Sequence, residues 1–136
     1  MCFRGRLIVA DGIRGIYRIS ADGKEEEMLV PSEEVVAGRP IKFVNSVSLA
    51  TDGAIYYTSL SSRWNMADGL LTATAMAPTG RVLRYDPKRK ASEVLVDGLS
   101  FANGIVLSHK EDFLLYAELG TGKQYFCRNA KCKMPS

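Results

Sequence analysis

Two asparagines occupy matching positions in two similar segments of the chain. Asn45 stands in FVNSV and Asn103 in FANGI, each near the start of a predicted strand. An asparagine side chain carries a neutral, hard oxygen that suits Ca²⁺, an ion that takes six to eight oxygen ligands. The alternative is that each asparagine only caps a turn, because its side chain bonds readily to nearby backbone. Because asparagine recurs at the same position of both segments, a shared binding role is favoured.

Each asparagine opens a predicted β-hairpin. The first consists of a strand over residues 44–49, a turn over 51–53 and a strand over 55–58, and the Asp-Gly in its turn is a strong hairpin signal. The second has predicted strands over residues 101–107 and 113–118, separated by a polar turn. The residues after each asparagine are rich in the β-branched and aromatic types that strands favour.

The hairpins repeat along the chain with a period of about sixty residues. The segment GIYRISADGKEEEMLV also matches RVLRYDPKRKASEVLV further along. Repeated units of up to four strands are typical of β-propeller blades, which pack around a channel, whereas a β-sandwich with coincidental repeats is the alternative. We therefore predict an all-β fold, a partial β-propeller of about two to two and a half blades. Both asparagines would stand at the channel end of a blade's innermost strand.

The charge distribution excludes one broad class of function. The chain of 136 residues has 18 Lys+Arg against 15 Asp+Glu, a net charge of +3. This excess comes from residues 119–136, which contain basic side chains and no acidic ones, and residues 1–118 are close to neutral. A clustered basic surface that binds nucleic acid is therefore not expected. No apolar run has the length of a membrane span or a signal-peptide core, so neither is predicted in this chain.

The other polar candidates have structural explanations. Cys127 and Cys132 are too few for a zinc site, which needs four ligands, and a disulfide between them is the other option. Glu118 ends an apolar strand, and a strand-end charge that reaches water is preferred over an acid in the channel. Residues 65–77 fit a short helix and an irregular insertion equally well.

Three segments together carry a family resemblance: FVNSV…DGAIYYTSLSSRW, GRVLRYDPKRKASEVLVDGL and FANGIVLSHKEDFLLYAE. They resemble the strictosidine synthase-like family, in particular its branch of adipocyte plasma membrane-associated protein and hemomucin. The resemblance covers about residues 5–118. It implies a partial propeller over residues 1–118, with the conserved region at about 41–118, and a divergent basic tail over residues 119–136. Family members are six-bladed propellers of well over twice this length, so the resemblance implies a truncated fragment.

The resemblance also implies a role for the two asparagines. In the related paraoxonase-type propellers, the matching asparagines bind a channel calcium together with carboxylates from other blades. Asn45 and Asn103 are therefore the expected metal ligands, with Ca²⁺ as the cofactor of the complete propeller. Ser46 and Ser59 stand where many relatives carry Asp, which lowers the expected cation affinity. The implied function of the parent is calcium-dependent hydrolysis of a small-molecule ester or lactone, and the fragment alone is expected to be inactive.

A second function fits the same resemblance. It is a non-catalytic, hemomucin-like binding propeller, and with either function the parent is expected at a membrane or in the secretory pathway. Condensation of the strictosidine synthase type is least favoured, because the catalytic glutamate of that enzyme has no counterpart in this chain. Isolated blades would leave exposed sheet edges and an apolar face, so self-association is expected.

Overall fold

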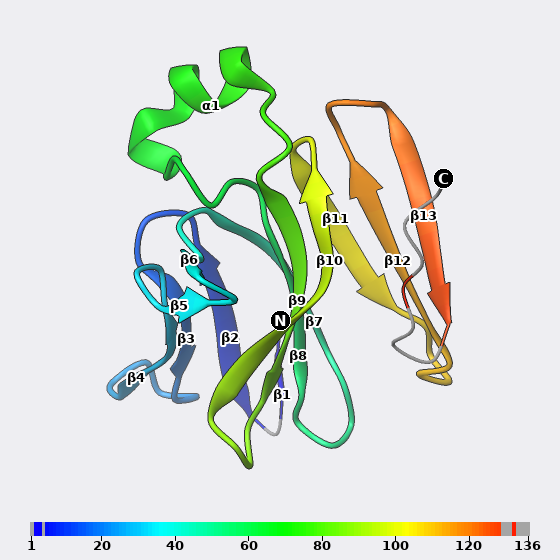
Figure 1. Cartoon of the computed structure of the whole chain (residues 1–136). Helices are drawn as coiled ribbons and strands as arrows, with labels where there is room; N and C mark the ends of the chain where they lie inside the picture. Colours follow the sequence, from blue (N-terminus) through cyan, green and yellow to red (C-terminus); the bar gives the residue numbers. More distant parts are fainter. Residues whose placement is uncertain (1, 4, 129–131, 133–136) are drawn as a thin grey trace.

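The chain folds into three main antiparallel β-sheets that stand side by side like blades (Figure 1). Our computed structural model describes residues 2–3, 5–128 and 132. The first sheet contains, in order, β1 (Cys2–Phe3), β2 (Arg6–Asp11), β3 (Gly15–Ile19) and β4 (Glu26–Pro31). The second contains β7 (Val44–Leu49), β8 (Ile55–Ser59), β9 (Gly80–Asp86) and β10 (Ala91–Leu99). The third contains β11 (Ala102–Leu107), β12 (Phe113–Glu118) and β13 (Lys123–Arg128).

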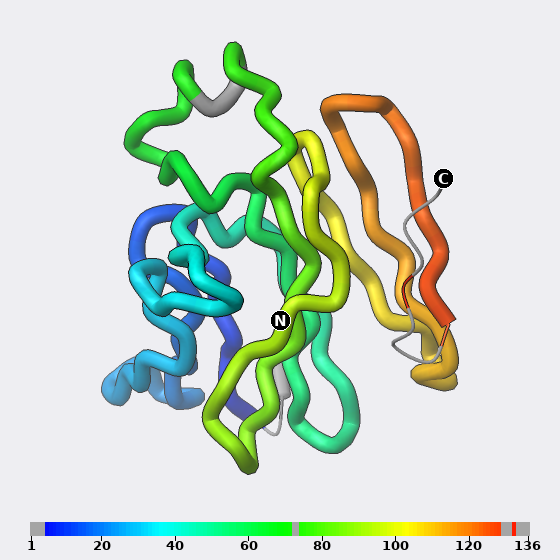
Figure 2. The backbone as a smooth tube through the Cα atoms, in the orientation of Figure 1, coloured from blue at the N-terminus to red at the C-terminus, as the bar shows by residue number. Residues whose placement is uncertain are grey.

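Acidic residues at strand ends form the hairpin turns. Asp52 Oδ1 accepts a hydrogen bond from the backbone N–H of Ala54 at 2.9 Å, and Gly53 takes a φ of 91°, which glycine adopts without strain. Asp86 Oδ1 accepts the backbone N–H of Lys88 at 2.9 Å in the same way. These local bonds produce the tight hairpins visible in Figure 2 and fix the register of each returning strand.

The innermost strands of the second and third sheets are joined by side chains. Ser48 Oγ, on β7, accepts the backbone N–H of Leu107, on β11, at 2.9 Å. Apolar clusters fill the spaces between the sheets on both sides of the second sheet. The cluster shared with the first sheet includes Ile8, Ile16, Val30, Ile55, Tyr57 and Leu83. The cluster shared with the third sheet includes Val82, Val96, Ile105, Leu114, Tyr116 and Cys127.

The insertion after β8 is helical. It consists of a 3₁₀ turn (Met66–Asp68) followed by α1 (Gly69–Ala75), which settles the two alternatives left by the sequence. Asn65 caps the 3₁₀ turn, because its Oδ1 accepts the backbone N–H of Ala67 at 2.8 Å. Among the described residues, no helix is long and apolar enough to cross a membrane.

A strand was not expected from the sequence after Glu118, but β13 extends the third sheet there. It pairs with β12 along its whole length, from Phe113 opposite Arg128 to Glu118 opposite Lys123. Cys127 is buried against the second sheet and forms a disulfide with Cys132. The first part of the basic segment is therefore an ordered strand of the third blade.

A buried arginine fixes the connection between the first two sheets. This connection contains a short ladder of β5 (Val35–Val36) and β6 (Arg39–Pro40). Arg81, in β9, is fully buried and donates hydrogen bonds to the carbonyl oxygens of Val36 at 2.8 Å and Pro40 at 2.6 Å. Burial lowers the pKa of Arg81, yet an arginine remains charged in proteins. The backbone carbonyl oxygens of Val36 and Pro40 therefore stabilise a buried positive charge.

One face of the third sheet is apolar and exposed. Val106, Leu115 and Phe126 form a row across its three strands and are 51%, 37% and 51% exposed. We expect the chain to associate with itself through this row as its concentration rises, because association would remove the row from water. Sedimentation velocity tests this: Val106→Lys should weaken association, whereas Leu70→Lys, on the exposed helix, should not. A chain that stays monomeric at all concentrations would contradict the expectation.

Candidate functional site

Asn45 and Asn103 each occupy the second position of an innermost strand. In the ladder between β7 and β8, Asn45 has no paired residue on the partner strand. In the ladder between β11 and β12, Asn103 and Gly104 likewise have none. Extra residues of this kind form β-bulges, which re-aim side chains and are frequent beside active sites. Both asparagines therefore lie at the same kind of irregularity, at the same end of neighbouring sheets.

One buried hydroxyl joins the two bulges. Thr58, in β8, is fully buried. Its Oγ1 accepts the backbone N–H of Ser46 at 3.2 Å and donates to the carbonyl oxygen of Asn103 at 2.5 Å. Because Ser46 directly follows Asn45, a single oxygen atom lies between the two bulged segments. The fold thus brings together two asparagines that are far apart in the sequence.

Replacing Thr58 by valine is expected to lower the free energy of unfolding by about 2 kcal/mol. The valine keeps the shape but leaves the N–H of Ser46 and the carbonyl of Asn103 without this partner. Denaturant unfolding measures the loss, and Thr58→Ser should recover most of it because the hydroxyl remains. If Thr58→Val had an unchanged midpoint, the link between the bulges would carry no stability.

The two amide side chains form part of a possible cation site but not a complete one. Asn45 and Asn103 are half-buried, and neither amide group bonds to another described residue. Within the described residues, no group of three or more His, Cys, Asp or Glu side chains could hold a metal ion. Two neutral oxygens fit a hard cation such as Ca²⁺ as members of a larger set of six to eight. Further ligands would have to come from elsewhere in a complete propeller.

The two serines that replace expected acids have structural partners. Ser46 Oγ accepts the backbone N–H of Ile105 at 3.4 Å and lies beside the asparagine pair. Ser59 is fully buried, and its hydroxyl donates to the carbonyl oxygen of Ile41 at 2.5 Å. Ser59 therefore holds the segment that enters β7.

Glu118 does not reach water, which corrects the expectation from the sequence. It is 6% exposed, and its carboxylate accepts bonds from the Ser100 N–H at 2.7 Å, Thr121 Oγ1 at 2.6 Å and Tyr125 Oη at 2.7 Å. Glu118 pairs with the residue before Asn103, as Ser59 pairs with the residue before Asn45. Three protein donors offset the cost of burying the charge, so Glu118 is a structural carboxylate.

These bonds make part of the stability depend on pH. Burial alone would raise the pKa of Glu118, but hydrogen bonds from Thr121, Ser100 and Tyr125 outweigh it and hold the pKa below the ordinary 4.5. A lowered pKa stabilises the fold above the unfolded-state value, and this contribution disappears as the pH falls through the folded-state value.

We therefore expect the stability difference between the natural chain and Glu118→Gln to be largest near neutral pH and to shrink in acid. Denaturant unfolding between about pH 7 and pH 3 measures it. Glu93→Gln, at an exposed position, controls for the loss of one charge. A difference for Glu118→Gln that stays constant down to the lowest pH would contradict this account.

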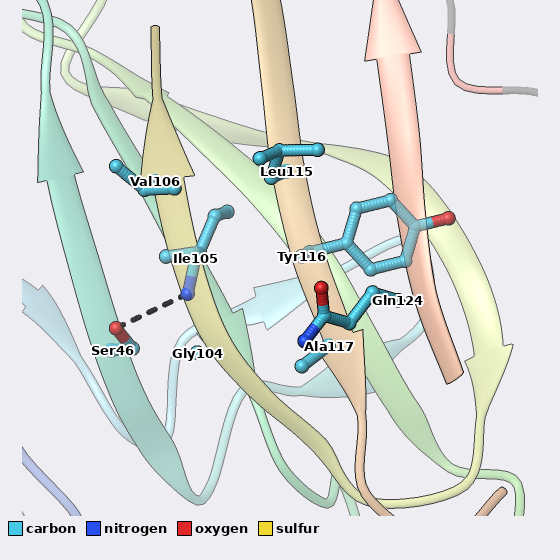
Figure 3. Close-up of a pocket in the computed structure, with 8 residues that line it drawn as sticks. All are labelled: Ser46, Gly104, Ile105, Val106, Leu115, Tyr116, Ala117 and Gln124. Carbon is cyan, nitrogen blue, oxygen red and sulfur yellow. Dashed lines mark hydrogen bonds between the residues drawn. The ribbon is translucent and has the colours of Figure 1, made fainter. Parts of the chain in front are cut away.

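A groove begins beside the asparagine pair. It has a volume of about 340 Å³, and Figure 3 shows the side chains around it. Ser46 and Gly104, the residues that directly follow the two asparagines, lie at one end. The remaining lining is mostly apolar and comes from β11, β12 and β13: Ile105, Val106, Leu115, Tyr116, Ala117 and Gln124. No sequence pattern indicated this groove or the role of Thr58, because both depend on strand register.

Comparison with known proteins identifies the family. Residues 45–130, which include both asparagines, match the family described as strictosidine synthase. The chain belongs to this family. Within the family it is 38% identical over 115 residues to mouse adipocyte plasma membrane-associated protein, covering 84% of this chain and 28% of the relative. It is 36% identical over 131 residues to the Drosophila melanogaster protein named hemomucin, covering 92% of this chain and 22% of the relative. The chain thus spans about three tenths of the length of its mouse relative.

Solved structures confirm the fold of this strictosidine synthase family member. A gluconolactonase from Xanthomonas campestris superposes with a TM-score of 0.64 at 22% identity, covering 89% of this chain and 40% of that one. A chain of the nidogen–laminin complex superposes with a TM-score of 0.65 at 12% identity, covering 94% and 42%. At such identities the likeness concerns the fold alone, and it confirms a partial β-propeller.

Proposed function

We propose that the complete propeller containing this segment is a calcium-dependent hydrolase of esters or lactones. Asn45 and Asn103 would supply two of the ligands of its cation, and residues 1–136 alone would not be catalytic. The observation that carries the proposal is the pair of bulged asparagines, joined through Thr58 and standing at the mouth of an apolar groove.

The chemistry of the pair suits this role. A bound divalent cation polarises a carbonyl oxygen and lowers the pKa of a bound water. The two amide oxygens are neutral, so they bind the ion without cancelling its charge, and that charge remains available to the substrate. The bulges hold the asparagines in position through the buried Thr58 hydroxyl, which limits the movement needed when a ligand binds.

The groove suits the apolar part of an ester or lactone. Its apolar lining can take carbon atoms out of water, and the hydroxyl of Ser46 and the amide of Gln124 offer polar contacts at the same surface. A substrate placed there would have its carbonyl end toward the residues that follow the asparagines. One structural neighbour is a gluconolactonase, which agrees with a lactone as substrate.

A non-catalytic binding propeller is the second candidate. It is favoured by the names of the curated relatives, which describe membrane-associated proteins and hemomucin. Because these relatives are named as membrane-associated proteins, we propose a membrane or secretory location for the complete protein. Both candidates use the same end of the propeller, and they differ in whether a bound ester is cleaved.

Hydrolysis assays of the complete protein separate the two candidates. Aryl esters and lactones of several ring sizes are incubated with the protein, with a calcium chelator and with added Ca²⁺. The proposal predicts turnover that the chelator abolishes and Ca²⁺ restores. Saturable binding of these compounds without turnover would support the binding propeller instead. Residues 1–136, assayed alongside, should show no turnover with or without Ca²⁺.

A further inference from the structure

A second cavity lies at the opposite end of the second sheet from the asparagines. It has a volume of about 490 Å³ and lies between the first two sheets, beside the hairpin turns at the bottom of Figure 1. Leu49, which lines it, is four residues along β7 from Asn45, which corresponds to about 13 Å of extended strand. Sites for small molecules range from about 300 to 1,000 Å³, so this cavity has a suitable size. We call it the basal cavity.

The inner wall of the basal cavity is apolar. Ile8 and Leu29 come from the first sheet, and Leu49 and Ile55 from the second. Ile8 and Ile55 are 4% and 2% exposed, so the wall is continuous with the packed core between these sheets. Carbon atoms of a ligand that entered here would leave water for an apolar surface.

The rim of the basal cavity has an excess of positive charge. It carries two acids, and both have a cationic partner: Glu27 forms an ion pair with Arg18, and Asp52 lies 3.7 Å from the guanidinium of Arg84. Glu27 is therefore paired within the rim, and Asp52 shares the single charge of Arg84 with Asp86 and Glu93.

Two cations on the same rim remain. Arg6 and Lys90 line the cavity from different sheets, and neither side chain forms an ion pair or a hydrogen bond with another residue in the described part of the chain. The paired guanidinium of Arg18 and then the charges of Lys90 and Arg6 hold the pKa of Glu27 below its ordinary value. Both cations therefore act on the same region of the rim.

A tyrosine hydroxyl also opens on the basal cavity. Tyr85 is 5% exposed as a whole residue, and its hydroxyl forms no hydrogen bond with any described residue but is not one of the buried unpaired atoms, so it reaches the cavity. Burial raises the pKa of Tyr85, so the phenol keeps its proton and can donate a hydrogen bond. An oxygen atom of a bound ligand would replace water as its acceptor.

We propose that the basal cavity binds an amphipathic organic anion, a carboxylate or sulfonate carried on an apolar group. The apolar group lies against Ile8, Leu29 and Ile55, and the anionic head lies between Arg6 and Lys90. The Tyr85 hydroxyl donates to an oxygen of the ligand. This site is separate from the asparagine pair and does not depend on the proposed hydrolysis.

Decanoate tests the proposal on residues 1–136, with decanol as the probe that lacks the charge. Binding is followed by calorimetry and by methyl NMR signals. We expect decanoate to shift the methyl signals of Ile8, Leu29 and Ile55 saturably, and to bind about tenfold more tightly than decanol. The methyl groups of Val35 and Leu70, which are exposed and line neither the groove nor the basal cavity, report any unspecific adsorption and should not follow the same saturation curve.

Charge variants identify the head-group site. Lys90→Glu and Arg6→Glu should each weaken decanoate binding by about tenfold or more, because attraction becomes repulsion. Arg89→Glu, in the same turn but outside the cavity lining, makes the same charge change and should have little effect. Tyr85→Phe should weaken binding by about fivefold through the loss of one hydrogen bond.

The proposal would be overturned by shifts confined to residues outside the basal cavity, such as Val35 and Leu70, by equal affinity for decanoate and decanol, or by equal effects of Lys90→Glu and Arg89→Glu. Each of these results would show that the anion does not occupy the basal cavity between the two cations.

Discussion

Arg81→Ala is expected to lower the free energy of unfolding by about 3–4 kcal/mol. Arg81 is the largest fully buried side chain among the described residues. Its removal leaves the carbonyl groups of Val36 and Pro40 without their hydrogen-bond donor. It also leaves a cavity between the second sheet and the connection that β5 and β6 form. Domains of this size are stable by only about 5–15 kcal/mol, so the variant should lose a large share of its stability.

Denaturant unfolding of Arg81→Ala, Arg81→Lys and Arg84→Ala compares the stability contributed by a buried arginine with that contributed by a partly exposed one. Arg84→Ala, in the same strand, removes ion pairs that are partly exposed and should cost about 1 kcal/mol or less. Arg81→Lys keeps the charge but lacks the forked guanidinium that reaches both carbonyls, so its loss should be intermediate. Equal losses for Arg81→Ala and Arg84→Ala would contradict the role assigned to the buried guanidinium.

In the complete propeller, Asn45→Ala and Asn103→Ala should each reduce calcium-dependent hydrolysis by about 100-fold or more. In the proposed site, each substitution would remove one oxygen ligand of the cation and leave the other asparagine in place. If both bind one ion, the double variant should be little worse than either single variant, because the groups act as a unit. Rates at saturating substrate over a series of calcium concentrations measure the effect.

Asn65 supplies the matched control. Asn65→Ala makes the same chemical change in the helical insertion, where it removes only the cap of a 3₁₀ turn, and hydrolysis should be nearly unchanged. Asn45→Asp should raise calcium affinity, because affinity rises with the number of charged ligands. Strictly additive losses in the double Asn45/Asn103 variant, or a lower calcium affinity in Asn45→Asp, would argue that the asparagines do not share an ion.

Most of the fold follows from local sequence signals. The predicted strands at 44–49 and 113–118 have the bounds observed for β7 and β12, because alternating residues and acidic or glycine-containing turns specify each hairpin locally. β13 was missed for a physical reason. Its inward residues Tyr125 and Cys127 flank the outward-facing Phe126, so residues 125–127 read as one short apolar run in which the alternation is hidden.

Only part of the candidate site could be predicted from local sequence patterns. The positions of Asn45 and Asn103 near the start of innermost strands could be read from the repeated hairpins. The bulges could not, because an extra residue in a ladder appears only when the partner strand is known. The burial of Glu118 depends on Tyr125, which lies on a strand that was not expected. Thr58 lies in β8 directly after two tyrosines, and nothing in that segment indicated that its hydroxyl would join two blades.

A calcium titration of the complete propeller, followed through the side-chain amide NMR signals of its asparagines, tests most directly whether Asn45 and Asn103 share one cation. The account predicts that both signals shift together with a single dependence on calcium concentration, while the signal of Asn65 stays in place. Signals of Asn45 and Asn103 that do not move, or that move with different calcium dependences, would contradict it.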